Sequence, residues 1–335
     1  MRHRLHFPLY LLLILLLCTA SHVNAQPAPP PAKLPKEVRQ YLDRVLLLIE
    51  KQALVTKKID WPRLRREVAQ QAQGLANVAE CQPVLEYIRH TLHEAGDKHS
   101  YFIYPAQAAK LTSANYAGQP AESRYLDNGV GYLKIPEFTP MEPDVEHAFA
   151  QGIRRQLDSL ATQHQLTGWV LDLRHNTGGN MYPMLEGVQP LLGEGTYGYF
   201  IFRDGERALH SQGAKEPVPQ SAAAANTSLR VAVLLDSLTA SSGEMVAIAF
   251  KGRPNTQFFG QTSAGYTTSN RRFELAGGAY LMLATGYMAD RNRQAYLSGI
   301  TPDVVVEYTP AQSPDKTLDA ARHWVQQALP AKGKQ

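Results

Sequence analysis

The spacing of hydrophobic positions changes near residue 125, and this change divides the chain into two parts. Over residues 34–96, apolar residues recur at the spacing of a helix face. The clearest stripe consists of Val84, Leu85, Ile88 and Leu92. A further helix is predicted to begin at Asp60, whose side chain can cap it, with Pro62 in its first turn. We therefore expect a helical N-terminal subdomain over residues 35–110.

From residue 125 onward, short apolar runs alternate with helical patterns. Strands are expected over 129–135, 168–174, 229–236 and 256–260, and helices over 143–165, 181–192 and 241–250. This alternation is typical of right-handed βαβ units with a parallel sheet. Residues 273–288 are expected to form an antiparallel pair that turns at Gly277 and Gly278. The pattern predicts an α/β core over residues 125–310, followed by a C-terminal helix and tail over residues 311–335.

The N-terminus has the pattern of a secretory signal peptide. A basic start precedes an apolar run at Leu9–Leu17, and the small-x-small segment ending at Ala25 provides a cleavage site. The apolar run is far shorter than the ~20 residues that span a bilayer, so we expect no stable membrane insertion after cleavage. A retained anchor and a lipid-modified Cys18 are the alternatives. We predict a signal peptide over 1–25, a proline-rich linker over 26–34, and a periplasmic or secreted protein.

Composition adds two constraints to this picture. The chain has 335 residues, of which 44% are hydrophobic, and its formal net charge is +4. Signal cleavage removes Arg2 and Arg4 and leaves +2, which is too mild to indicate nucleic-acid binding. Cleavage also removes Cys18 and leaves Cys81 without a partner for an internal disulfide. A buried, inert thiol is the favoured interpretation of Cys81, ahead of a catalytic one.

The segment 231–244 carries the clearest candidate for covalent chemistry. An apolar strand runs into a turn of small residues that contains Ser241 and Ser242, and a helix then opens. The N–H groups and dipole at a helix N-terminus favour developing negative charge. The alternative is that one of these serines only caps the helix, with Glu244 in the first turn.

Two further segments contain polar groups suited to catalysis. In the first, residues 171–180, Gly178 and Gly179 allow backbone N–H groups to approach a ligand, with Arg174 and Asn176 as candidates for orienting the turn. No Gly-Lys-Ser/Thr follows, which disfavours a nucleotide site, and the adjacent His175 is interpreted as structural. In the second, residues 96–102, proton-transfer groups gather around His99, although a solvated surface loop has the same composition.

Six segments in this order resemble the C-terminal-processing (tail-specific) serine peptidases, in the wider family that includes the tricorn core protease. The matching segments are 96–100, 130–136, 172–179, 239–244, 260–265 and 299–303. The resemblance implies a ClpP/crotonase-like βαβ superhelix preceded by a helical subdomain. Processing peptidases of this family usually carry a PDZ domain before the first core strand. Residues 112–127 are too few for one, so we expect none here.

The resemblance also assigns roles to residues. It makes Ser241 the nucleophile and places the oxyanion hole at Ser242 with Gly178 or Gly179, which agrees with the two donors that an acyl-transfer oxyanion needs. The family's lysine base would stand 25 residues after Ser241, where this chain has Tyr266.

Without that lysine, His99 is the candidate general base, because imidazole titrates near physiological pH. The tricorn branch orients its histidine with a late glutamate, but residues 290–298 contain none. Asp290 or Asp97 is expected to hold the imidazole instead. Lys98 and Lys251 are the remaining candidates for the base.

These inferences predict a secreted serine endopeptidase that hydrolyses protein substrates through an acyl-enzyme on Ser241. The alternative is a catalytically weak or inactive homologue that binds peptides or a partner protein. Acyl-CoA chemistry on the same fold is disfavoured, because secretion separates the protein from cytoplasmic CoA thioesters. We expect a polypeptide substrate, no cofactor, no nucleic acid and no metal, since His90 and His93 lack a third ligand. The sequence does not indicate an oligomeric state.

Overall fold

A computed structural model describes residues 34–210, 227–307 and 314–327. The predicted signal peptide, Cys18 and the linker up to residue 33 lie outside the described residues. The first described elements are three helices: α1 (Lys36–Gln52), α2 (Trp61–Gln71) and α3 (Gln82–Glu94). The Asp60 side chain accepts a hydrogen bond from the Arg63 N–H, which confirms the predicted cap of α2. Cys81 is buried and not in a disulfide.

The parallel sheet predicted for the core is confirmed. Its six strands follow the order β11-β8-β7-β4-β3-β2, and all neighbours are parallel except β2, which runs antiparallel to β3. The strands are β2 (Glu122–Leu126), β3 (Val130–Lys134), β4 (Gly168–Asp172), β7 (Arg230–Leu235), β8 (Thr256–Gly260) and β11 (Val304–Val305). Alternate side chains point to opposite faces, so each face of this sheet buries its own apolar cluster.

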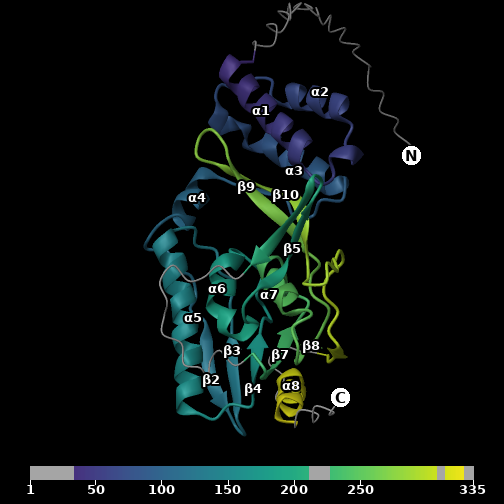
Figure 1. The fold of residues 1–335 in the computed structure, drawn as a ribbon. Helices are drawn as coiled ribbons and strands as arrows, with labels where there is room; N and C mark the ends of the chain where they lie inside the picture. The colour runs from purple at the N-terminus through teal and green to yellow at the C-terminus, as the bar shows by residue number, and fades with distance from the viewer. Residues whose placement is uncertain (1–33, 211–226, 308–313, 328–335) are drawn as a thin grey trace, which may run out of the picture.

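Helices cover both faces of this sheet. One face packs against α5 (Pro143–Gln163), α6 (Met181–Leu192) and α7 (Ser242–Phe250), and the other against α8 (Lys316–Gln326). The contact with α8 makes the expected C-terminal helix a part of the core rather than an appendage (Figure 1). The bounds of α6 and β8 are those predicted from the sequence.

A second, antiparallel sheet joins the helical layer to the core. It contains β1 (Tyr101–Ile103), β5 (Thr196–Phe202), β6 (Gly205–His210), β9 (Thr268–Glu274) and β10 (Tyr280–Ala289). The β9–β10 pair confirms the predicted antiparallel turn, whereas β1, β5 and β6 were not predicted. β10 crosses from one part to the other: Leu281 and Leu283 pack among α1–α3, and Met288 packs in the core (Figure 1).

The connection between the helical layer and the first core strands is short. β1 leads into α4 (Pro105–Leu111), and residues 112–121 then reach β2 without a helix or strand. Within the described residues, no helix is both long and apolar enough to cross a bilayer.

Candidate active site

The turn between β7 and α7 holds Ser241 in an unusual backbone conformation. β7 ends at Leu235, α7 begins at Ser242, and Ser241 between them has φ 51° and ψ −117°. A non-glycine residue with positive φ is strained, and such residues gather at functional sites. The same kind of sharp strand-to-helix turn exposes the nucleophile of other serine hydrolases. The predicted capping arrangement is also present, because Glu244 in the first turn of α7 accepts a hydrogen bond from the Ser241 N–H.

The His99 side chain lies within hydrogen-bond distance of this hydroxyl. Its Nε2 lies 2.9 Å from Ser241 Oγ, and its Nδ1 lies 2.8 Å from Thr268 Oγ1, at the start of β9. If Nε2 accepts the serine proton, Nδ1 must carry a hydrogen, and it then donates that hydrogen to Thr268. Among the described residues, no other basic side chain forms a hydrogen bond with Ser241 Oγ.

Burial keeps this imidazole neutral. It lowers the pKa of His99 from 6.5 to about 4, while the charge of Asp97 and a backbone hydrogen bond with Thr268 act in the opposite direction. Desolvation disfavours the charged form of a histidine, which explains the direction of the shift. At neutral pH the ring is therefore in the form that can accept a proton.

The two aspartates expected to hold the imidazole lie in other contacts. Asp97 accepts hydrogen bonds from the backbone N–H of His99 and from the N–H and hydroxyl of Ser100, so it fixes the His99 backbone rather than the ring. The carboxylate of Asp290 accepts from two backbone N–H groups in its own loop and from the Tyr296 hydroxyl. The position that we expected a carboxylate to fill is taken by Thr268. No motif marks this threonine, and sequence reasoning missed it.

The glycine turn after β4 lies directly against Ser241. Gly178 has φ +118°, and a Cβ on this residue would come within 2.7 Å of the Ser241 Cβ. The Gly178 N–H donates to Asn176 Oδ1, and the Ser242 hydroxyl donates to the Gly179 carbonyl. Within the described residues, the backbone N–H groups of Gly179 and Ser242 have no acceptor. Of the two glycines expected at an oxyanion hole, Gly179 is thus the one with a free donor.

Asn176 joins the glycine turn to the serine turn. Its side-chain amide donates to the carbonyls of Ile135 and Pro136, and its own carbonyl accepts from the Ala240 N–H. Asn176 is fully buried, and a Cβ on Gly243 would come within 2.6 Å of its carbonyl oxygen. Through these contacts Asn176 links the glycine turn to the serine turn.

Arg174, the other expected orienting residue, has a different position. Its guanidinium pairs with Asp172 at the end of β4 and with Asp315 at the start of α8. The two carboxylates raise its pKa despite burial. Arg174 therefore ties α8 to the sheet and does not contact Ser241.

Glu244 connects the serine turn to the loop that follows β8. Its buried carboxylate accepts from the Ser241 N–H at 3.0 Å, from the Ser263 hydroxyl at 2.5 Å and from the Gly265 N–H at 2.8 Å. Burial raises the pKa of Glu244, and these hydrogen bonds act against the rise. Because Gly265 precedes Tyr266, the same carboxylate fixes the loop that carries Tyr266.

Tyr266, at the position of the family's lysine, packs edge-on against the His99 ring with 5.5 Å between centroids. It is 39% exposed, so it lies at the rim of the site. Tyr182 is exposed in the first turn of α6, whereas Phe138 is fully buried against Phe149. Lys251, considered as an alternative base, lies over the Phe258 ring and near Asp303. Over the described ranges, no group of His, Cys, Asp and Glu side chains is arranged to hold a metal ion.

Ser241 lies at the strand ends of a parallel βαβ core, beside backbone N–H groups that have no acceptor among the described residues, and it is in contact with His99. This arrangement is of the serine-hydrolase type. The chain belongs to peptidase family S41, whose family model matches residues 129–306. The expected resemblance to C-terminal-processing peptidases is confirmed: a carboxyl-terminal-processing protease of Synechocystis is 28% identical over 53% of this chain and 38% of its own length. At the level of the family, the chain is a serine-type peptidase.

Two further similarities extend over most of the chain. The nisin-resistance protein of Lactococcus lactis is 28% identical, and the match covers 81% of this chain and 84% of that protein. The solved structure of a lipoprotein from Streptococcus agalactiae matches with a TM-score of 0.71 and 26% identity over 91% of this chain and 99% of that one. The photosystem II D1 C-terminal processing protease has the same fold, with a TM-score of 0.57 at 15% identity, over 82% of this chain and 94% of that one.

Proposed function

We propose that this protein is an exported serine endopeptidase that hydrolyses polypeptides through an acyl-enzyme on Ser241. The observation that carries the proposal is the 2.9 Å contact between His99 Nε2 and Ser241 Oγ. A serine hydroxyl at its own pKa is a weak nucleophile, and a base within hydrogen-bond reach is what activates it. The predicted signal peptide supports a periplasmic or secreted location.

The reaction begins with transfer of the Ser241 proton to His99 Nε2 as Oγ attacks the substrate carbonyl carbon. The tetrahedral oxyanion accepts hydrogen bonds from the N–H groups of Gly179 and Ser242 at the N-terminus of α7. The imidazolium then donates its proton to the leaving amine, and the peptide C–N bond breaks. A water molecule, deprotonated by the same imidazole, hydrolyses the ester and restores Ser241.

Thr268 has the orienting part in this scheme. It accepts the Nδ1 hydrogen and so keeps the ring in the tautomer whose Nε2 faces Ser241. In the Ser-His-Asp arrangement an aspartate fills this position and also stabilises the imidazolium. A neutral hydroxyl supplies the orientation without that charge, and Asp97, on the backbone side of His99, is the nearby anion that favours the protonated ring.

The comparisons support a peptide substrate. The family is a peptidase family, and the nisin-resistance relative, similar along most of this chain, is compatible with the same chemistry. The alternative function is a weak or inactive homologue that binds peptides. Two observations favour it: a tyrosine stands in place of the family's lysine, and no carboxylate among the described residues forms a hydrogen bond with the His99 ring.

A fluorophosphonate probe separates the two functions, because it labels only an activated serine. We expect labelling of the wild-type protein and cleavage of an unfolded protein substrate, both lost in Ser241→Ala and in His99→Ala. The exposed Ser159→Ala and His90→Ala substitutions serve as matched controls and should retain both activities. Absence of wild-type labelling favours the binding homologue, and full activity of both site variants rejects the assignment.

A further inference from the structure

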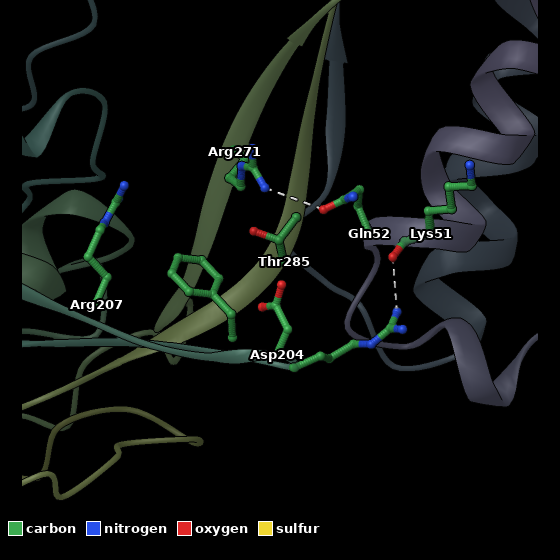
Figure 2. A pocket seen from close by; sticks show the side chains of 8 residues that line it. Lys51, Gln52, Asp204, Arg207, Arg271 and Thr285 are labelled. Atoms are coloured by element: carbon green, nitrogen blue, oxygen red, sulfur yellow. Dashed lines mark hydrogen bonds between the residues drawn. The ribbon is translucent and has the colours of Figure 1, made fainter.

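A cavity of about 420 Å³ lies beside the β9–β10 hairpin, and neither Ser241 nor His99 lines it. Its walls come from the end of α1, the β5–β6 hairpin, β9 and β10 (Figure 2). Arg271 on β9 donates to the Gln52 side chain, so the cavity opens where the hairpin meets the helical layer. The polar lining used below consists of Lys51, Arg203, Asp204, Arg207, Arg271 and Thr285.

Positive charge dominates this cavity. Lys51, Arg203, Arg207 and Arg271 line it together with a single carboxylate, that of Asp204. Among the described residues, none of the four cations lies within ion-pair distance of a carboxylate. Arg203 donates only to backbone carbonyls at the end of α1. Four cations gathered around one space repel one another and attract an anion.

A buried hydroxyl lies at the centre of these side chains. Thr285 is 4% exposed, and its Oγ1 has no hydrogen-bond partner within the described chain. Figure 2 shows it between Arg271, Asp204 and the end of α1. Its hydroxyl oxygen is itself buried, so Thr285 forms part of the cavity wall, and the groups available to a ligand are the exposed cations. Thr285 also stands where the β9–β10 register shifts, and such bulges are common beside binding sites.

The cavity is linked to the active site through β9. Thr268 contacts the His99 ring and Asn270 contacts the His99 carbonyl, so these two side chains share one face of β9. Arg271 points to the other face, because side chains alternate along a strand. Three residues of strand, about 10 Å, separate Thr268 from Arg271. A substrate segment of roughly five to eight extended residues can therefore reach from Ser241 around the hairpin to the cavity.

We propose that this cavity is an exosite that binds a carboxylate of the polypeptide substrate, either its C-terminal carboxylate or an acidic side chain. This inference rests on the proposed peptidase function. Arginine forms paired hydrogen bonds with a carboxylate, and three arginines line the cavity. The exosite selects substrates with an anionic group several residues away from the cleaved bond.

The test measures peptide binding in the Ser241→Ala background, where nothing is cleaved. Two pairs of fluorescent short-peptide pools are synthesised. The first pair differs only at the C-terminus, which is a carboxylate in one pool and an amide in the other. The second pair differs at one fixed internal position, which is Glu in one pool and Gln in the other. Fluorescence anisotropy gives the affinity ratio of each acidic pool to its neutral twin. We expect the acidic pool to bind about ten times more tightly than its neutral twin, which is the effect of one set of charge-assisted hydrogen bonds. The pair that shows it identifies the source of the carboxylate.

Adding Arg271→Gln should bring the ratio close to one. Arg44→Gln, which removes the same charge from an exposed position on α1, should leave the ratio unchanged. Equal affinities for acidic and neutral pools, or a ratio that survives Arg271→Gln, overturn the exosite. Wild-type hydrolysis of the same pools is measured in parallel. Hydrolysis without carboxylate-dependent binding rejects the exosite alone, and carboxylate-dependent binding without hydrolysis rejects the proposed peptidase function.

Discussion

The Nδ1 atom of His99 lies 2.8 Å from the hydroxyl oxygen of Thr268, an uncharged residue in the place where a carboxylate is expected. The ring is thereby oriented toward Ser241 by a hydroxyl, and the nearby charge of Asp97 lies on the backbone side of His99. In other serine hydrolases one aspartate both orients the histidine and stabilises its charge. In the proposed mechanism these two contributions come from Thr268 and Asp97. The predictions below test each contribution.

Thr268→Val should lower the rate of fluorophosphonate labelling by roughly tenfold, because valine keeps the shape but cannot accept the Nδ1 hydrogen. Thr268→Ser should retain most of the wild-type rate. The fold should be unaffected in both variants, as measured by thermal unfolding. An unchanged labelling rate in Thr268→Val would show that packing alone orients the imidazole.

The pH dependence should reflect the buried state of His99. Burial lowers its pKa to about 4, so the ring remains a neutral base well below pH 6.5. We expect the labelling rate to stay near its plateau at pH 5.5 and to fall only as the pH approaches about 4. A pH–rate profile with its acid limb centred near 6.5 would contradict this.

The same shift makes stability depend on pH. Between pH 6.5 and about 4 the unfolded chain takes up a proton at His99 that the folded chain does not, so stability should fall as the pH falls through this window. Denaturant unfolding of the wild type and of His99→Ala at pH 7 and pH 4.5 measures the difference. The variant should lose less stability on acidification, and parallel losses in both proteins would assign the effect to other groups.

Gly178→Ala should lower the labelling rate at least a hundredfold, because the added Cβ would come within 2.7 Å of the Ser241 Cβ. Gly195→Ala is the matched control: its φ of +106° is similarly unfavourable for alanine, but nothing lies within 4 Å of the added atom. The control should keep its labelling rate with only a modest loss of stability. Equal losses of activity in both variants would point to backbone strain rather than to the contact with the nucleophile.

Glu244→Gln should both destabilise the fold and disorganise the serine turn. The partners of the carboxylate are the Ser263 hydroxyl and the backbone N–H groups of Ser241, Gly265 and Tyr266, and all of them donate. The NH₂ group of glutamine is itself a donor and cannot accept from them. The mismatch in a buried network should cost about 2–4 kcal/mol of unfolding free energy. Denaturant unfolding and probe labelling of the same sample measure both effects. Wild-type stability with lost labelling would instead assign Glu244 a direct part in the chemistry.

The elements of the core could be predicted from the sequence because each is a local pattern. The apolar runs at β4 and β7 and the helical periods at α5 and α6 specify type and bounds within a few residues. β5 and β6 were missed, since a strand of the second sheet is defined by the partner across it rather than by its own alternation.

The residues at the strand ends were predictable for a related reason. Ser241, Gly178 and Asn176 follow parallel strands, whose carboxyl ends meet at one edge of a sheet. His99 could be chosen because the family's lysine is replaced and few groups titrate near neutral pH. Which partner the imidazole takes was beyond such reasoning, because that partner lies on β9, 169 residues along the chain.

The sequence by itself thus determined the parallel core, the serine turn with its glycine partner, and the need for a base other than the family's lysine. The tertiary structure alone decided that Thr268 rather than Asp290 holds His99, that Gly179 rather than Gly178 has the free donor, and that four cations line one cavity. Patterns along a chain specify local backbone and burial. Hydrogen-bond partners and charge clusters are made by side chains from distant segments, and only the packing of β9 and β10 between the two parts brings those segments together.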